Sequence, residues 1–187
     1  MCIRDSSYAG AAPTGSASEA EYLELALAAV VDPADIHASL AEALPDGLDV
    51  VEVVESAGGS LSELLEASRW RLDVPGVEDE VTADLAAFLA AESVMVQRMT
   101  KKGLRDLDAR SAVVALSIAG SAPPTVTLEL VLRHLVPAIR PDDVLAGMAS
   151  LAGRETSGVP LLTRLEQGPL DLSDTANPQV RDPLHLG

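Results

Sequence analysis

The sequence predicts an α+β protein made of two tandem ferredoxin-like sub-domains of the β-α-β-β-α-β type, the first of them incomplete. Along the chain, the spacing of apolar residues changes repeatedly between the alternating pattern of strands and the three-to-four-residue pattern of helices. Over residues 68–165 the expected order is β-α-β-β-β-α-β, close to the ferredoxin-like plan with an added or split strand. The residues before it supply only β-α-β. We therefore expect the remnant of a first sub-domain over residues 7–58 and a second sub-domain over residues 59–166.

The first sub-domain is predicted from three consecutive patterns. Over residues 21–27 Leu23, Leu25 and Leu27 fall on one face and Tyr22 and Glu24 on the other, which is typical of a half-buried strand. Asp32 and Pro33 supply the N-cap and the first turn of a helix, which a Pro-Asp-Gly turn ends. Residues 48–55 are rich in β-branched side chains and predict the next strand.

The second sub-domain is predicted in the same way. Ser60 begins a capping box and therefore a short helix. The elements expected after it are a strand (70–74), a helix (81–91), a strand (94–99), a polar stretch (100–110), two strands joined by a hairpin-like connection (112–118 and 125–133), a helix (141–151) and a closing strand (159–165). Prolines and scattered charges then predict a flexible tail over residues 167–187.

The first six residues are interpreted separately. Met-Cys-Ile-Arg-Asp-Ser resembles a leader that arises in assembled environmental sequences when a sequencing adapter is read through. We therefore expect residues 1–6 to be artefactual and the natural protein to begin upstream of Ser7.

Composition limits the expected partners and cofactors. A formal net charge of −16 disfavours general attraction to phosphate backbones, and aromatic residues at 2% offer few rings for base stacking, so no DNA partner is expected. Cys2 is the single cysteine, and the three histidines are far apart in sequence, so no metal site and no cofactor are expected in this chain. Neither a membrane-spanning stretch nor a secretory signal is visible, which predicts a cytoplasmic protein with no membrane partner.

Several motifs occur in the order of one known family. They are the run Ser7–Leu23, in which a proline-and-glycine loop leads into Ser-Glu-Ala-Glu-Tyr, the Ala-Leu-Pro-Asp-Gly-Leu segment at 43–48, Lys101-Lys102-Gly103 with Asp108-Ala109-Arg110, and the helix start at 140–145. Over residues 7–165 the chain resembles the radical SAM-linked domain family, whose biochemical role is unknown. The family's upstream strand, arginine-rich helix and Pro-His-Pro loop have no counterpart here, which implies an N-terminal truncation.

The best candidate site is a basic segment in this acidic chain. Five of the thirteen basic residues fall between Arg98 and Arg110, next to a glycine that permits a tight turn. The candidate binding residues are Arg98, Lys101, Lys102, Gly103, Arg105, Asp108 and Arg110. Phosphate, nucleic acid or an acidic partner surface could use this segment. The alternative is a solvated loop whose charges offset Asp106 and Asp108. Asp106, Asp108 and Arg110 alternate, so on an extended segment they would share one face as a structural Asp–Arg pair.

Three functional hypotheses follow. The resemblance implies an accessory or substrate-binding module that works with a radical SAM iron–sulfur protein, fused or neighbouring, in RNA or nucleoside modification. The iron–sulfur cluster and S-adenosylmethionine are then expected in that partner. The alternatives are an independent enzyme domain with its site between the two sub-domains, and a plain protein-interaction module.

Overall fold

The computed structural model describes residues 3–56, 58–100, 103–154 and 158–185. Over these residues the chain is a mixed α+β structure. Its helices are α1 (Pro33–Ala43), α2 (Leu61–Leu64), α3 (Glu78–Ala90) and α4 (Pro141–Leu151), with a short 3-10 helix, η1 (Ala109–Ala112). Its strands are β1 (Ile3–Ala9), β2 (Ala17–Ser18), β3 (Tyr22–Leu27), β4 (Ala67–Pro75), β5 (Met95–Thr100), β6 (Gly103–Asp108), β7 (Val113–Ala122), β8 (Thr125–Arg133), β9 (Leu161–Gly168), β10 (Leu170–Asp171) and β11 (Gln179–Val180).

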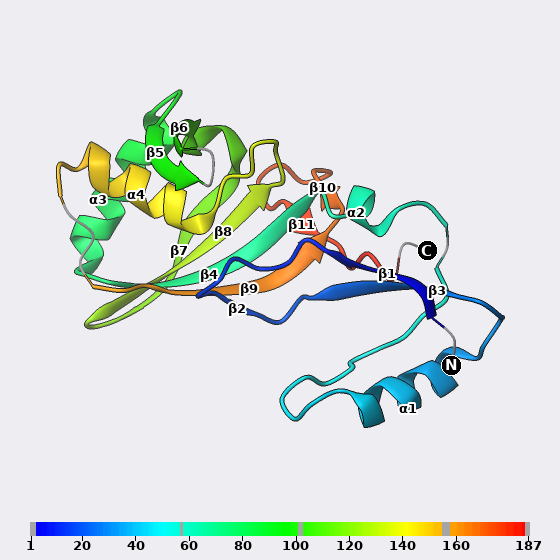
Figure 1. Ribbon diagram of the computed structural model, residues 1–187. Coiled ribbons are helices and arrows are strands. Elements are labelled where there is room, and N and C mark those ends of the chain that lie inside the picture. The colour runs from blue at the N-terminus through cyan, green and yellow to red at the C-terminus, as the bar shows by residue number, and fades with distance from the viewer. Residues whose placement is uncertain (1–2, 57, 101–102, 155–157, 186–187) are drawn as a thin grey trace.

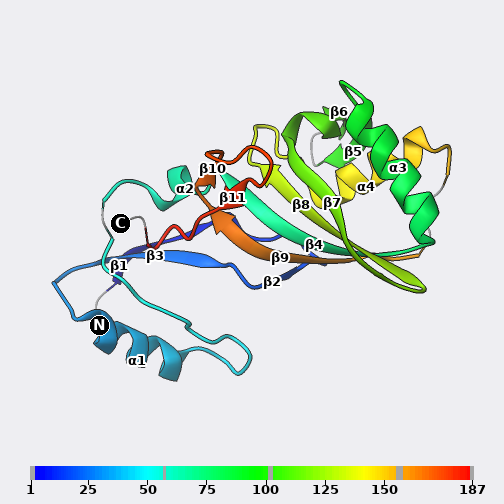
Figure 2. The ribbon, with the colours of Figure 1, turned by 180° about the vertical axis from the view of Figure 1, so that it is seen from behind.

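A five-stranded sheet in the order β2-β9-β4-β8-β7 forms the centre of the molecule (Figure 1). β4 pairs antiparallel with both β8 and β9, and β7 pairs antiparallel with β8. Only the short contact between β2 and β9 is parallel. α3 follows β4 and α4 follows β8, and both helices lie on the same face of the sheet (Figures 1 and 2).

Side chains along β4 point alternately to the two faces of this sheet. Trp70, Leu72 and Val74 are buried and belong to the main core, which also includes Phe88 of α3 and Val144 of α4. The intervening residues face the other side, where Ala67 packs in a small cluster with Val131 and Val180. The helix-covered face therefore holds the core, and the C-terminal strand β11 covers part of the opposite face.

Two smaller β units flank the sheet. β1 and β3 form an antiparallel two-stranded ribbon that lies with α1 at the end of the molecule far from α3 and α4 (Figure 1). β5 and β6 form an antiparallel hairpin between α3 and η1, and its buried residues Val96 and Leu107 join the main core. β10 and β11 make a short antiparallel ladder.

The fold class predicted from the sequence is confirmed at the level of α+β. The strand predicted over residues 48–55 is wrong, because these residues are irregular, and Val51 is 92% exposed. A β-branched composition gives a strand only where a neighbouring strand offers hydrogen bonds and packing. The tandem ferredoxin-like arrangement is consequently not confirmed. Residues 3–6, expected to be artefactual, form part of β1, and the polar stretch expected over 100–110 contains β6.

Candidate functional site

The basic segment predicted from the sequence lies on the β5–β6 hairpin. Arg98 of β5 is directly opposite Arg105 of β6. Gly103 begins β6 with a φ of 105°, a conformation that a residue with a side chain rarely adopts. Lys101 and Lys102 lie outside the described residues.

Arg98 is used inside the protein. Its Nη1 donates to Oδ2 of Asp143 at 2.5 Å and its Nη2 donates to the carbonyl of Ala138 at 2.9 Å. Asp143 is buried and also accepts from the backbone N–H of Arg140, which caps the start of α4. Arg98 therefore ties the hairpin to the first turn of α4 and is not a free binding group.

Asp108 and Arg110 also have structural roles. Oδ1 of Asp108 accepts from the backbone N–H groups of Val94 and Arg110 at 2.9 and 3.0 Å. Burial raises the pKa of Asp108, but these hydrogen bonds and those of neighbouring serines outweigh it and hold the pKa below the usual value. Arg110 lies in η1 and donates to the carbonyl of Val113. Asp106 and Asp108 lie on the same face of β6, as expected for an extended segment, but Arg110 is not on this strand because the chain turns into η1 after Asp108.

The outward side of the hairpin carries exposed apolar side chains next to a hydrogen-bonded polar pair, Gln97 and Asp106. Met99 and Leu104 face one another across the ladder and are 73% and 57% exposed. Met95 is exposed on the same strand as Met99. Arg105 is exposed, and within the described part of the chain its side chain forms no ion pair or hydrogen bond. Arg105 is opposite Arg98 and therefore points to the other face of the hairpin. We call Met95, Met99 and Leu104 the hairpin surface.

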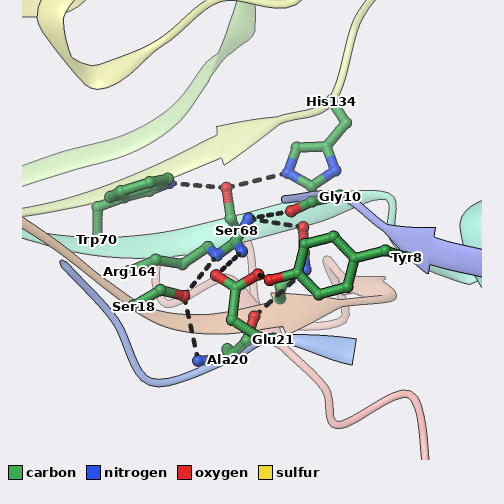
Figure 3. A network of polar contacts seen from close by, with 10 residues as sticks. Tyr8, Gly10, Ser18, Ala20, Glu21, Ser68, Trp70, His134 and Arg164 are labelled. Carbon is green, nitrogen blue, oxygen red and sulfur yellow. Dashed lines mark hydrogen bonds and ion pairs between the residues drawn. The ribbon is translucent and has the colours of Figure 1, made fainter. Parts of the chain in front are cut away.

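A second cluster, which the sequence did not reveal, surrounds Arg164 of β9 (Figure 3). Its guanidinium is almost fully buried, stacks over the ring of Trp70 at 5.7 Å and donates four hydrogen bonds. The acceptors are Oγ of Ser18, the carbonyl of Gly10, Oε1 of Gln167 and Oε1 of Glu21. Arg164 therefore links the segment before β3 to the central sheet.

A β-bulge in β9 places the side chains of Arg164 and Gln167 on the same face of the sheet. In the ladder between β4 and β9, Trp70 is opposite Arg164 and Arg69 is opposite Glu166, so Leu165 has no partner. On a regular strand Arg164 and Gln167 would point to opposite faces, because side chains alternate. The extra residue reverses the alternation, and both side chains point into the cluster.

Glu21 connects Arg164 to Tyr8. The Tyr8 hydroxyl donates to Oε2 of Glu21 while Arg164 binds Oε1. Burial raises the pKa of Glu21, but hydrogen bonds from Ser18 and Tyr8 and the positive charge of Arg164 outweigh it and keep the pKa below its ordinary value. The same contact raises the pKa of Tyr8, since removing its proton would place a second negative charge beside the carboxylate. Glu21 is therefore an ionised acceptor at neutral pH.

Ser68 and His134 form the other side of the cluster. Nε2 of His134 is 3.0 Å from Oγ of Ser68, and Nδ1 is 2.7 Å from the carbonyl of Leu65. The carbonyl can only accept, so Nδ1 carries the proton and Ser68 donates to Nε2. Burial lowers the pKa of His134, against the effect of the Leu65 bond, and the charge of Arg164 lowers it further.

This serine–histidine pair is positioned for structure and not for attack on a substrate. A distance of 3.0 Å is within the range for a nucleophile and its base. Ser68 is only 2% exposed, however, and its Oγ already accepts from Nε1 of Trp70 at 2.8 Å. A substrate carbonyl has no approach to a hydroxyl buried in this way.

A polar cavity of about 230 Å³ lies beside Gln167, between β9 and the C-terminal segment. Tyr22, Glu166 and Asp182 contribute to its lining. Burial, and next the charge of Asp182, raises the pKa of Tyr22 to about 12, so this phenol stays protonated.

Among the described residues, no group of three or more His, Cys, Asp and Glu side chains is arranged to hold a metal ion. No described helix is long and apolar enough to cross a membrane.

Comparison with known protein families identifies the chain. A family model described as "Uncharacterized protein conserved in bacteria (DUF2344)" matches residues 4–141, well over half of the sequence. The chain belongs to the DUF2344 family. The match includes the cluster residues of the N-terminal segment, of β4 and of the loop after β8, and it ends before Arg164. No curated protein and no solved structure matches this DUF2344 chain.

One feature of the sequence could have indicated the cluster. Arg164 is the single charged residue in the mostly apolar stretch 159–165, and a charge within a buried strand requires a partner. The sequence does not identify that partner, because Glu21 is 143 positions away.

Proposed function

We propose that this DUF2344 protein is an accessory module that works in the cytoplasm with a radical SAM iron–sulfur enzyme. It holds substrate or docks the catalytic protein, and the substrate class is RNA or a modified nucleoside. The iron–sulfur cluster and S-adenosylmethionine belong to the partner. The resemblance of Ser7–Leu23 and the motifs after it to the radical SAM-linked domain family supports this proposal.

The tandem ferredoxin-like interpretation of the fold belongs to the same proposal. The strand order β9-β4-β8-β7, with α3 and α4 as the two crossovers, supports it for the second sub-domain. The β5–β6 hairpin is then an insertion between α3 and β7. For the first sub-domain, the supporting elements are the β1–β3 ribbon and α1.

The observation that carries the docking role is the hairpin surface. A cluster of exposed apolar side chains is typical of protein contacts, whereas apolar residues that are exposed singly are common on any protein surface. Met99 and Leu104 lie opposite one another, and Met95 is exposed on the same face of β5. This surface fits an apolar surface on the partner.

The alternative of an independent enzyme has one observation in its favour. The Arg164 cluster lies where the N-terminal segment meets the sheet, which is the predicted place for a site between two sub-domains. Its charged groups, the Arg164 guanidinium and the Glu21 carboxylate, are bound to one another. The Ser68 hydroxyl is buried and accepts a hydrogen bond from Trp70. The cluster is therefore better suited to fixing the N-terminal segment than to carrying out a reaction.

Co-purification with the proposed radical SAM partner tests the docking role. Met99→Ser with Leu104→Ser removes two exposed apolar groups from the hairpin surface and should reduce recovery of the partner at least about tenfold. Val30→Ser with Val51→Ser is the control, because it removes two apolar groups that are at least 92% exposed elsewhere. Equal recovery with both variants contradicts docking through the hairpin.

Binding of RNA is tested separately. If the basic segment holds RNA, changing Lys101, Lys102 and Arg105 together to Ala abolishes a salt-dependent complex of the protein with RNA. Binding that is unchanged in this variant, or absent from the unmodified protein, removes RNA from the proposal and leaves docking of the catalytic protein.

A further inference from the structure

Residues 169–185 cross the face of the central sheet opposite α3 and α4 (Figure 2). We call them the C-terminal strap. The strap contains the antiparallel ladder between β10 and β11, and Val180 of β11 packs on this face with Ala67 and Val131. The strap is therefore attached to the central sheet through its short strands.

The strap then reaches the N-terminal part of the chain. The Asp182 carboxylate is hydrogen-bonded to the phenol of Tyr22, the first residue of β3. Nε2 of His185 is 3.0 Å from Oε2 of Glu52, which lies in the irregular segment after α1. The strap therefore joins the central sheet, β3 and the segment after α1.

The strap also forms part of the wall of the polar cavity beside Gln167. Val180, Arg181 and Asp182 of the strap line this cavity together with Tyr22 and Gln167. Gln167 is fully buried. A strap that left the sheet would consequently widen the opening of this cavity to solvent.

Gly168, the last residue of β9, makes room for the closed strap. A Cβ at this position would clash with the carbonyl oxygen of Arg181 and would lie 3.0 Å from Cδ of Pro183. Gly168 is not among the glycines with positive φ, so alanine suits its backbone conformation. An alanine at this position would therefore disturb the strap and not the strand that carries it.

The strap is held less firmly than the strands of the central sheet. Its buried residues are Pro178, Val180 and Pro183. Its contacts with Glu66 and Glu52 lie at exposed positions, where water competes for the same polar groups. β4, in contrast, is paired along both of its edges. A segment with few buried apolar contacts opens at a lower free energy than a strand of the core.

The ladder inside the strap depends on its contact with the sheet. β10 and β11 pair over two residues each, and the backbone N–H of Arg181 donates to the carbonyl of Pro169 at 2.9 Å. A two-stranded ribbon of this length is not stable in isolation. The strap therefore loses its ladder when it leaves the sheet, and its backbone amides become open to exchange together.

We propose that the C-terminal strap is a lid, which opens as a unit while the central sheet stays folded and thereby exposes Tyr22 and the cavity beside Gln167. This inference concerns a motion of the chain itself and does not depend on the accessory function proposed above.

Hydrogen exchange on the unmodified full chain tests the opening. The backbone N–H groups of Leu170 and Arg181 are hydrogen-bonded in the closed strap. Both should show the same protection, and both should exchange at least about a hundredfold faster than the slowest amides of β4. Exchange of these two amides as slow as that of β4 overturns the proposal, because the strap would then open only when the sheet unfolds.

Gly168→Ala tests the lid by displacing it. In this variant the amides of Leu170 and Arg181 should exchange at least about tenfold faster than in the unmodified protein, while those of β4 stay unchanged. Gly120→Ala is the matched control, because its φ is also not positive and none of the surrounding atoms lies within 4 Å of the added Cβ. Equal exchange in the two variants, or faster exchange of β4 in Gly168→Ala, overturns the proposal.

Nitration of the tyrosines tests what the lid covers. Tyr8 is 57% exposed and lies outside the lining of the cavity, so it serves as the internal reference in the same protein. With tetranitromethane and mass spectrometry of the peptides, the nitration of Tyr22 relative to Tyr8 should rise about tenfold in Gly168→Ala and stay unchanged in Gly120→Ala. A ratio that is the same in all three proteins overturns the assignment of the strap as the lid of this cavity.

Discussion

Replacing Arg164 with Met removes the group that ties the N-terminal segment to the central sheet. The methionine keeps much of the apolar stem but leaves the Glu21 carboxylate, Oε1 of Gln167 and the Gly10 carbonyl without their donor. The contact over the ring of Trp70 is lost as well. We therefore expect both a loss of stability and a change around Trp70.

The magnitude follows from the burial of the two charges. Removing one partner of a buried ion pair costs about 3–5 kcal/mol. Arg164 is 3% exposed but the Glu21 side chain is 30% exposed, so water can partly solvate the carboxylate that remains. The lower end, about 3 kcal/mol, is then expected, which corresponds to a fall in Tm of about 6–12 °C for a chain of this length.

Thermal unfolding and tryptophan fluorescence measure this effect. Trp70 is the one tryptophan of the chain, so its emission reports on the cluster alone and should shift to the red in Arg164→Met. Arg154→Met is the control, because Arg154 pairs with Asp84 and Glu80 at the surface, where solvent screens the ion pairs and Tm should barely change. A Tm in Arg164→Met equal to that of the unmodified protein, with unchanged emission, would refute the structural role of Arg164.

Two further predictions concern the same cluster. Because the pKa of Glu21 is held below its ordinary value of 4.5, its ionised form stabilises the protein above that pH, and the stabilisation is lost as the pH falls through the lowered pKa. The difference in Tm between the unmodified protein and Glu21→Gln should therefore be largest near pH 7 and shrink below about pH 4, and a difference independent of pH contradicts the ion pair. Gly10→Ala should lower Tm more than Gly15→Ala in parallel melts. Both glycines have positive φ, but a Cβ on Gly10 would lie 2.3 Å from Oε1 of Gln167, whereas none of the surrounding atoms is within 4 Å at Gly15; equal losses would show that the close approach to Gln167 is unimportant.

Elements that carry their own burial pattern could be predicted from the sequence. β4 and β8 alternate because one face of each is in the core, and α3 presents Val81 and Phe88 to that core. These patterns are local, so a single sequence contains them. Residues 48–55 have the composition of a strand, but the described structure offers them no adjacent strand, and composition alone cannot show this.

The candidate site was harder to predict for two physical reasons. Arg98, Asp108 and Arg110 are clustered in sequence, yet each is bound to a different part of the protein, so their charges do not form one free surface. The Arg164 cluster joins residues far apart in the chain, and it depends on a bulge at Leu165 that reverses the direction of the side chains. A bulge of this kind is determined by pairing between strands and leaves no periodic pattern in the sequence.

Reconstituted turnover tests the accessory role most directly. A radical SAM protein of the kind proposed as partner would be assayed with its substrate alone, with the unmodified DUF2344 protein, and with the variant Met99→Ser with Leu104→Ser. The accessory role predicts that turnover requires the radical SAM protein, increases when this chain is added, and falls back with the hairpin variant. Turnover by this chain without the radical SAM protein would contradict the accessory role and favour an independent enzyme.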